Sequence, residues 1–405
     1  MARNRINIIP LPDNGESHPP PEGDSRWNVL CTSPELAGSF TREPSARRSR
    51  LKPLPHTAST RPWPEMPGGN HIIPGRAGYT VLQSSQSVKG DSRRGKAKVT
   101  KEFSQMEWNQ SVQDDCRQLV RLAIREDLER RFDITTLSLV DRNMGGRTTI
   151  AAREGGVICG LLAAQLALDE MDVSAEWTSH VADGDTVSAG TPLATLSGRA
   201  RDLLTVERLL LNLIGRLSGV ATLTRQYVDQ VAGIKAKIYD TRKTTPGWRR
   251  LEKFAVRCGG GRNHRTGLFD AVLIKDNHLA LVAKQGTHAS SPADAVSLGR
   301  QRLLEMFPEG GEQMIVEIEV DTLAQLENVL PQKPDIVLLD NMSHAQLRSA
   351  VSLRDTTQPA TELEASGGVN LSTVADIART GVDRISVGAL THSAVSLDVA
   401  MDWAP

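Results

Sequence analysis

The stretch that decides the fold runs from Asp240 to His278 and reads DTRKTTPGWRRLEKFAVRCGGGRNHRTGLFDAVLIKDNH. It contains nine Lys or Arg residues against four Asp or Glu residues, whereas the chain of 405 residues has a formal net charge of zero. Clustered Arg suits carboxylate and phosphate groups, because each guanidinium offers paired donors in one plane. The stretch is either a solvated basic face or an anion-binding site. Lys275 directly follows the apolar run Ala271 to Ile274, which favours the site.

After Gly233 the chain alternates short apolar runs with helical segments. Six runs are expected to be strands: Ile234–Tyr239, Ala271–Ile274, Met314–Val320, Ile336–Leu339, Thr361–Ala365 and Arg384–Val387. This alternation predicts a parallel sheet, open or closed into a barrel. Site-like residues stand directly after several runs, namely Lys275, Asp340, Ser366 and Gly388. Because the carboxyl ends of barrel strands form the active-site face, a barrel is favoured, with an open doubly wound sheet as the alternative.

Acidic and glycine-containing segments also lie near these strand ends. Glu317 and Glu319 are two residues apart on one predicted strand, so both are expected on one face, toward Asp340 on the next strand. Carboxylate oxygens are the ligands that Mg²⁺ prefers, although interior ion pairs with Lys or Arg are the alternative. The segments 366–368 and 388–393 follow the last two strands and predict a phosphate-binding cradle of backbone N–H groups.

The first hundred residues differ from the rest of the chain. Thirteen of the 21 prolines precede Glu102, and 16 Lys or Arg face 9 Asp or Glu up to Phe103, a net charge of +7. Such a composition buries too little apolar surface to offset the entropy of ordering, so residues 1–105 are expected to be disordered. Three explanations compete. The first is a transit peptide, but transit peptides are poor in acidic residues and this segment is not. The second is a nucleic-acid-binding arm. The third, which we favour, is an over-long reading of the gene with the true start at Met106.

The cysteines and the apolar runs indicate where the protein works. Its four cysteines show no C-x-x-C spacing, which argues against metal cages and disulfides and for a reducing compartment. The sequence shows neither a signal-peptide core nor an apolar run near the ~20 residues of a membrane span. The predicted location is the cytoplasm.

The middle of the chain combines helical and β-rich patterns. An apolar stripe over Val112 to Ile124 predicts a helix, and the short β runs of residues 180–198 resemble the module of biotin and lipoate carriers. Carriers need a lysine at a hairpin tip, and no lysine lies in residues 146–233, so a structural β module is favoured. Leu203 to Ala232 predicts a long helix. Its Arg208 extends either to solvent or into a site across a subunit interface, and the sequence favours neither.

Six motifs in order resemble the quinolinate phosphoribosyltransferase family, also called the carboxylating nicotinate-nucleotide pyrophosphorylases. They are Asp240-Thr-Arg-Lys-Thr, Gly259-Gly-Gly-Arg-Asn-His-Arg, Leu273-Ile-Lys-Asp-Asn-His, Glu317-Ile-Glu-Val-Asp, Leu338-Leu-Asp-Asn and Ser366-Gly-Gly. The resemblance runs from about Met106 to the C-terminus. It implies an α/β fold, with an α/β open-faced N-terminal domain that contains the β module (106–219) and an irregular, TIM-like α/β barrel (220–392). Residues 393–405 would return to the N-terminal domain, and residues 1–105 would be an extension.

The resemblance also implies roles for individual residues. The quinolinate carboxylates would be bound by Arg242, His264, Arg265 and Lys275, and by Arg208 from the neighbouring subunit of a homodimer. Phosphoribosyl pyrophosphate and its Mg²⁺ would be held by the catalytic residues Lys243, Glu319 and Asp340, of which Glu319 and Asp340 are the metal ligands. The 5-phosphate would be held by Ser366, Gly367, Gly388 and His392.

The implied activity is the transfer of phosphoribosyl from phosphoribosyl pyrophosphate to quinolinate with decarboxylation. Its products are nicotinate mononucleotide, pyrophosphate and CO₂, in the de novo biosynthesis of NAD. The implied assembly is a homodimer with shared active sites, or a hexamer, with no nucleic-acid or membrane partner. The alternative is a paralogue of the same fold associated with molybdenum transport, which should lack part of the cationic set. The segment from Ala283 to Gln313 is expected to be a long loop at the barrel rim.

Overall fold

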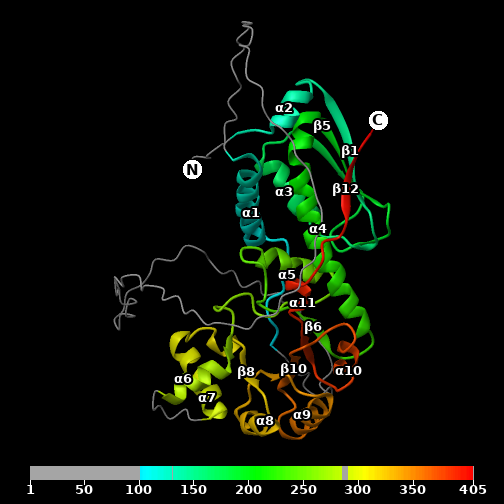
Figure 1. Cartoon of the computed structure of the whole chain (residues 1–405). Helices are drawn as coiled ribbons and strands as arrows, with labels where there is room; N and C mark the ends of the chain where they lie inside the picture. The colour runs from blue at the N-terminus through cyan, green and yellow to red at the C-terminus, as the bar shows by residue number, and fades with distance from the viewer. Residues whose placement is uncertain (1–100, 130, 285–290, 405) are drawn as a thin grey trace, which may run out of the picture. The chain divides into compact units, whose positions relative to one another are not determined.

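The computed structural model describes residues 101–129, 131–284 and 291–404. The disorder predicted for residues 1–105, and the alternative of a nucleic-acid-binding arm, therefore fall outside the described residues except at 101–105. Figure 1 shows an N-terminal region of helices and antiparallel strands and a second region of parallel strands surrounded by helices. The long helix α4 joins the two regions.

The N-terminal region is built on a four-stranded antiparallel sheet in the order β12-β1-β5-β3. Its strands are β1 (Gly145–Ala152), β3 (Ala175–Ser179), β5 (Pro192–Arg199) and β12 (Val399–Trp403). The late strand β12 pairs with β1 from Thr148, opposite Trp403, to Ala152, opposite Val399. The barrel is thus inserted in the sequence between two adjacent strands of this sheet.

Helices cover this sheet, and a small β pair flanks it. Helix α1 (Gln110–Leu128) starts at Asn109, whose side chain accepts a hydrogen bond from the backbone N–H of Val112. Its buried residues follow the predicted apolar stripe. The remaining elements are α2 (Ile134–Leu139), β2 (Gly156–Val157), α3 (Leu161–Glu170) and β4 (Thr186–Val187), with β2 antiparallel to β4. The β-rich pattern predicted for this part of the chain is confirmed.

Helix α4 (Ala200–Gln230) confirms the predicted long helix. Its small residues let another segment approach closely, because a Cβ at Gly219 would lie 2.0 Å from the carbonyl oxygen of Val395. At Gly215 the backbone carbonyl accepts a hydrogen bond of 2.9 Å from the N–H of Leu397. The chain therefore lies against α4 on its way from the barrel to β12.

The second region is a six-stranded parallel sheet in the order β6-β11-β10-β9-β8-β7. Its strands are β6 (Lys237–Tyr239), β7 (Val272–Ile274), β8 (Val316–Val320), β9 (Ile336–Asp340), β10 (Glu362–Ser366) and β11 (Arg384–Ser386), one for each predicted strand. The last strand, β11, pairs with the first, β6, so the sheet curves back on itself. Within the described residues, only β6 and β7 at its two edges are not paired with each other. An irregular α/β barrel is confirmed over the open doubly wound sheet.

Helices connect the barrel strands. They are α5 (Arg249–Cys258), α6 (Asp276–Lys284), α7 (Pro292–Met306), α8 (Leu323–Val329), α9 (His344–Thr357), α10 (Val374–Ala378) and α11 (Ala389–His392), with single turns at Gly311–Gln313 and Leu330–Gln332. The prediction of a long loop over residues 283–313 is wrong, because α7 occupies about half of this segment. Ser291 and Asp294 form a capping box there, and Pro292 starts the helix. Residues 285–290 lie outside the described residues.

Residues Lys101–Met106, named here the base segment, cross the barrel at the N-terminal ends of its strands. The Lys101 ammonium donates to the carbonyl oxygen of Met314 (3.0 Å), two residues before β8, and pairs with Asp335 (3.2 Å), directly before β9. The Phe103 side chain is 3 % exposed and packs in an apolar cluster with Ala271, Ile315 and Ile336. Disorder was therefore the wrong prediction for residues 101–105, because one aromatic and two charged side chains there find partners in the barrel. A chain that started at Met106, the start favoured from the sequence, would lack these contacts.

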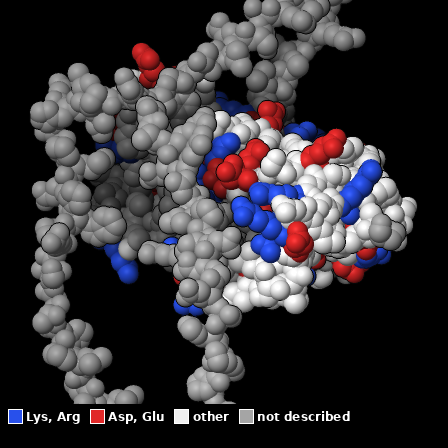
Figure 2. Space-filling model, turned by 90° about the horizontal axis from the view of Figure 1, so that it is seen from above, with Lys and Arg blue, Asp and Glu red and all other residues white. Residues whose placement is uncertain are grey.

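Two surface properties bear on possible partners. No helix among the described residues is long and apolar enough to cross a membrane. On the face shown in Figure 2, Lys and Arg side chains lie among Asp and Glu side chains. For the residues visible there, the surface is mixed in charge and not uniformly cationic.

Candidate active site

The C-terminal ends of the barrel strands enclose a cavity of about 750 Å³. It is lined by every predicted site residue except Arg208, namely Arg242, Lys243, His264, Arg265, Lys275, Glu319, Asp340, Ser366, Gly367, Gly388 and His392. These residues come from β8, β9 and β10, from the loops after β6, α5, β7, β10 and β11, and from helix α11. A parallel sheet closed into a barrel brings such strand ends to one face, so residues far apart in the sequence meet in one cavity.

The cationic side of the cavity rests on a buried network below it. Asp240 and Lys253 are both fully buried and form an ion pair. The Asp240 carboxylate also accepts from the backbone N–H of His264 (2.9 Å) and from the side-chain amide of Asn263 (2.7 Å). Burial raises the pKa of Asp240 and lowers that of Lys253, while their mutual attraction opposes both shifts. The network fixes the loop that presents His264 and Arg265.

Both ring nitrogens of His264 have protein partners. Nδ1 accepts a hydrogen bond of 2.8 Å from the backbone N–H of Arg265. Nε2 therefore carries the ring proton, and it lies 3.1 Å from a Glu317 oxygen and 3.6 Å from a Glu364 oxygen. His264 thus lines the cavity while its polar atoms face the protein. Its role as a quinolinate ligand stays a prediction.

Glu364 forms the buried floor of the cavity together with His264 and Glu317. Its side chain is fully buried, and neither carboxylate oxygen has a hydrogen-bond partner among the described residues. Burial raises the pKa of Glu364 to about 7; nearby Glu317 adds to this rise, and His264 opposes it. The raised pKa favours the protonated, neutral form of this carboxyl group more than in an exposed Glu.

Two guanidinium groups lie above this floor. Arg265 is 6 % exposed, and its Nη1 donates to the carbonyl oxygen of Ala271 (3.2 Å). Burial, and then the nearby positive charge of Arg242, lower the pKa of Arg265. The Nε of Arg242 is buried and has no hydrogen-bond partner among the described residues. Two close guanidinium groups with unused donors form a site for an anion.

The acidic side of the cavity lies on β8 and β9. Glu319 forms an ion pair with Lys275, as the alternative interpretation of these acids predicted. The Asp340 carboxylate accepts a hydrogen bond of 2.7 Å from the side-chain amide of Asn341. Glu319 and Asp340 offer only oxygen ligands, which is the donor set that Mg²⁺ prefers. The residues present therefore fit the predicted metal.

Glycines shape the loops after β10 and β11. Gly367 has φ of 94°, and a Cβ there would lie 2.1 Å from the side-chain oxygen of Asn341. A Cβ at Gly388 would lie 3.1 Å from both the Lys243 side chain and the His392 ring. The absence of a side chain lets Asn341 approach the backbone of the predicted phosphate cradle at Gly367, and lets Lys243 and His392 approach it at Gly388.

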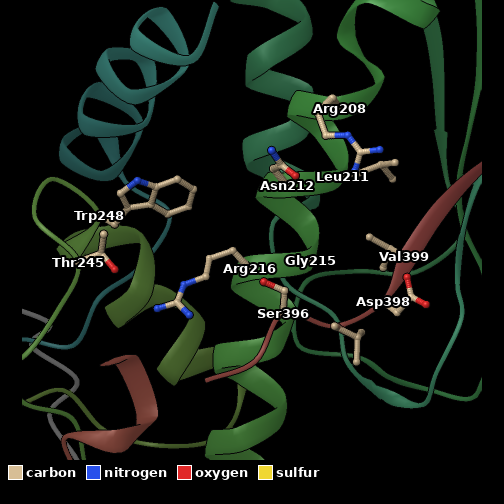
Figure 3. A pocket seen from close by; sticks show the side chains of 11 residues that line it. Arg208, Leu211, Asn212, Gly215, Arg216, Thr245, Trp248, Ser396, Asp398 and Val399 are labelled. Carbon is tan, nitrogen blue, oxygen red and sulfur yellow. The ribbon is translucent and has the colours of Figure 1, made fainter. Parts of the chain in front are cut away.

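Arg208 lies on α4, in a second cavity of about 530 Å³ that also includes Asn212, Arg216 and Trp248. Figure 3 shows Arg208 and Asn212 on one part of the helix, while Arg216 points toward Thr245. The structure therefore does not bring Arg208 to the catalytic cavity of its own chain.

The sequence did not identify two groups of polar residues near the cavity. Glu364 and Ser386 line it, and each is two residues from another inward-facing polar residue on its strand, a spacing that could have revealed them. Arg216 donates to Glu252 (2.6 Å) and to the carbonyl oxygen of Ala394 (2.8 Å). It thereby connects α4 to α5 and to the chain after α11. Because Arg216 stands on a largely apolar helix, the sequence gave no signal of these contacts.

Comparison with known proteins supports the fold and shows the family. Residues 133–218 match the model of the quinolinate phosphoribosyl transferase N-terminal domain, and residues 220–402 match that of the C-terminal domain. The chain is 44 % identical over 291 residues, 97 % of that protein, to the nicotinate-nucleotide pyrophosphorylase [carboxylating] of Mycobacterium leprae. It is 38 % identical over 274 residues, 89 % of that protein, to the probable enzyme of the same name in Bacillus subtilis.

A solved structure shows the same architecture. The nicotinate-nucleotide pyrophosphorylase of Francisella tularensis superposes with a TM-score of 0.66 at 35 % sequence identity. The match covers 75 % of this chain and 100 % of that one. The two domain models, the two relatives and this structure agree with the motifs and with the barrel. The chain belongs to the quinolinate phosphoribosyltransferase family.

Proposed function

We propose that this protein transfers the phosphoribosyl group of phosphoribosyl pyrophosphate to quinolinate and releases pyrophosphate and CO₂. The product is nicotinate mononucleotide, a precursor in the de novo biosynthesis of NAD. The observation that carries the proposal is a single cavity with a cationic side, an acidic side and a glycine-lined cradle. These three parts suit a dicarboxylate, a metal-bound pyrophosphate and a sugar phosphate.

The cationic side would bind and orient quinolinate. Arg242 and Arg265 provide guanidinium donors for the two carboxylates, and Lys275 can leave Glu319 because its side chain is 42 % exposed. The ring nitrogen of quinolinate is itself a nucleophile, so the attack on C1 of the ribose requires no general base. The task of these residues is to hold that nitrogen in line with the bond to pyrophosphate, and orientation supplies much of the rate enhancement.

The acidic side and the cradle would hold phosphoribosyl pyrophosphate. Glu319 and Asp340 would bind Mg²⁺, which when bound offsets the charge that grows on the pyrophosphate. Lys243 adds an ammonium next to the cradle, and the two carboxylates also favour the positive charge that develops on the sugar. The 5-phosphate would lie on the loops of Ser366, Gly367, Gly388 and His392.

The last step follows from the charge of the ring. As the carbon–nitrogen bond forms, the bond to pyrophosphate breaks and the ring nitrogen becomes positively charged. The carbon–carbon bond to the 2-carboxylate then breaks, CO₂ leaves, and the electron pair stays on the ring carbon, stabilised by that charge, until it takes up a proton. The Arg242 and Arg265 guanidinium groups keep the dicarboxylate in place during the first step.

The test is product formation by the purified full-length protein with quinolinate, phosphoribosyl pyrophosphate and Mg²⁺, next to nicotinate as the acceptor. We expect nicotinate mononucleotide and CO₂ from quinolinate and none from nicotinate, because the cavity holds cations for two carboxylates. A folded sample that is inactive with quinolinate would refute the proposal.

The proposal includes a homodimer with shared active sites. Its support is the position of Arg208 outside the cavity of its own chain, so that its predicted contact with quinolinate requires a second copy. Arg208→Ala and Lys243→Ala should each be inactive alone. After the two variants are mixed and refolded together, about a quarter of the wild-type activity should return, because half of the dimers carry one intact site. No recovery would contradict the shared site.

The proposal also includes a cytoplasmic location. Cys116, Cys159 and Cys258 are free thiols, as expected for a reducing compartment. Fractionation of cells that express the tagged protein would test it, and recovery with the membrane fraction would contradict it.

A further inference from the structure

The base segment contacts the active-site loop from the side opposite to the cavity. The Phe103 ring stacks on the imidazole of His264, with ring centroids 4.4 Å apart and an angle of 29° between the planes. The Arg384 guanidinium lies 5.6 Å from the centroid of the same Phe103 ring. His264 therefore has an aromatic support beneath it, contributed by a part of the chain that precedes the N-terminal domain.

Hydrogen bonds join the base segment to the residue next to His264. The backbone N–H of Asn263 donates to the side-chain oxygen of Gln105 (2.9 Å), and the Gln105 amide donates back to the carbonyl oxygen of Asn263 (3.2 Å). The backbone N–H of Met106 donates to the side-chain oxygen of Asn263 (2.6 Å). Three hydrogen bonds and one ring stack thus fix two consecutive residues of this loop.

The first half of the base segment is anchored separately. Glu102 accepts a hydrogen bond of 2.7 Å from the Tyr239 hydroxyl and lies 3.4 Å from the Arg384 guanidinium. Lys101 is held at the starts of β8 and β9, as described above. Phe103 itself is held by its stack on His264 and by the apolar cluster described above.

The position of Arg265 depends on this arrangement. Its backbone N–H donates to Nδ1 of His264, so a rotation of the imidazole would break that bond and release the Arg265 backbone. Glu317 fixes the opposite edge of the ring through Nε2. The ring is thus held by Phe103 on a face and by Glu317 and Arg265 on its edges.

We propose that Phe103 and Gln105 are positioning residues for the quinolinate side of the active site, acting on Arg265 through Asn263 and His264. The proposal rests on the proposed function for the identity of the substrate. It assigns a role in substrate binding to a segment outside both matched domains, which begin at residue 133. Phe103 contacts β8, β9 and β11 only at their N-terminal ends, through Ile315, Ile336 and Arg384. The residues proposed to bind phosphoribosyl pyrophosphate lie toward the opposite ends of these strands.

The experiment compares full-length wild type with Phe103→Leu, Phe103→Ala and Gln105→Ala. Phe103→Leu keeps most of the buried apolar surface but removes the ring stack, so it separates positioning from stability. Lys101→Ala is the matched control, because it removes a contact of the same segment that lies away from His264. Steady-state rates with each substrate varied give both KM values and kcat, and thermal unfolding reports stability.

We expect Phe103→Leu and Gln105→Ala to raise KM for quinolinate about tenfold, with KM for phosphoribosyl pyrophosphate within about twofold of wild type. Lys101→Ala should leave both KM values unchanged. An equal rise in both KM values would overturn the inference, and so would wild-type KM values in both variants. Phe103→Ala is included because Leu at position 103 is a small change, and the larger change to Ala should then raise KM for quinolinate. If wild type itself were inactive with quinolinate, the proposed function would fail instead.

Discussion

Replacing Glu364 by Gln should change how the stability of the protein depends on pH. Gln is close in shape to a protonated Glu but does not ionise, so the variant mimics the neutral carboxyl group. Burial raises the pKa of Glu364 to about 7, whereas an exposed Glu in the unfolded chain has a pKa near its ordinary 4.5. A carboxyl group whose pKa is raised by folding stabilises the folded state below the lower value. That stability is lost as the pH rises through the upper value.

The magnitude follows from the two pKa values. The difference corresponds to a loss of about 3 kcal/mol in the free energy of unfolding between pH 4.5 and pH 8 in the wild type. Gln at position 364 would not suffer this loss. The free energy of unfolding of the variant should therefore exceed that of the wild type by less than about 1 kcal/mol at pH 5 and by about 3 kcal/mol at pH 8.

Urea titrations at pH 5, 6, 7 and 8, followed by tryptophan fluorescence, would measure this difference for Glu364→Gln. The exposed Glu327, on α8, provides a control substitution, Glu327→Gln, which should give the same free energy of unfolding as wild type at every pH. A difference between Glu364→Gln and wild type that stays constant from pH 5 to pH 8 would refute the reasoning. It would mean that Glu364 is ionised in the folded state throughout this range, as it is in the unfolded chain.

Three further substitutions test other parts of the site. Arg265→Ala should raise KM for quinolinate about 10- to 100-fold, because a charged hydrogen bond to the substrate is lost. The KM for phosphoribosyl pyrophosphate should stay nearly unchanged, and an equal rise in both KM values would contradict the assigned role. Gly367→Ala should cost about 1–3 kcal/mol of stability and raise KM for phosphoribosyl pyrophosphate, since its φ is 94° and its Cβ would meet a side-chain oxygen at 2.1 Å. Gly190→Ala, at φ of 83° with open space around it, is the control that should show a smaller loss in the same unfolding assay. Lys253→Met should lower the free energy of unfolding by about 3–5 kcal/mol, because it leaves the carboxylate of Asp240 buried without its partner, and a loss below about 1 kcal/mol would contradict this.

The sequence predicts the barrel well because its strands are short apolar runs with polar or small residues directly after them. Lys275, Asp340 and Ser366 all mark strand ends, and the parallel fold brings those ends together. The sequence does not show which neighbours each side chain meets inside the barrel. It therefore did not predict that the polar atoms of His264 face Glu317 and the backbone of Arg265.

The errors of prediction have a physical origin as well. The composition of the first hundred residues is that of a disordered chain, and Phe103 lies at its end without any periodic pattern around it. Its burial depends on a hollow between Ala271, Ile315 and Ile336, residues far away in the sequence. A loop is the wrong prediction for the segment 283–313, because the capping box that starts at Ser291 is a local signal for α7 that the prediction did not use.

The pairing of β12 with β1 has a consequence for how the protein is made. Translation delivers β1 early and β12 only after all the barrel strands, so the nascent N-terminal sheet has an unpaired edge on β1 during most of synthesis. Such an edge is a template for pairing with other chains. Ribosome-bound or truncated chains that lack β12 are therefore the species most exposed to aggregation, and chaperones would be expected to act on this edge.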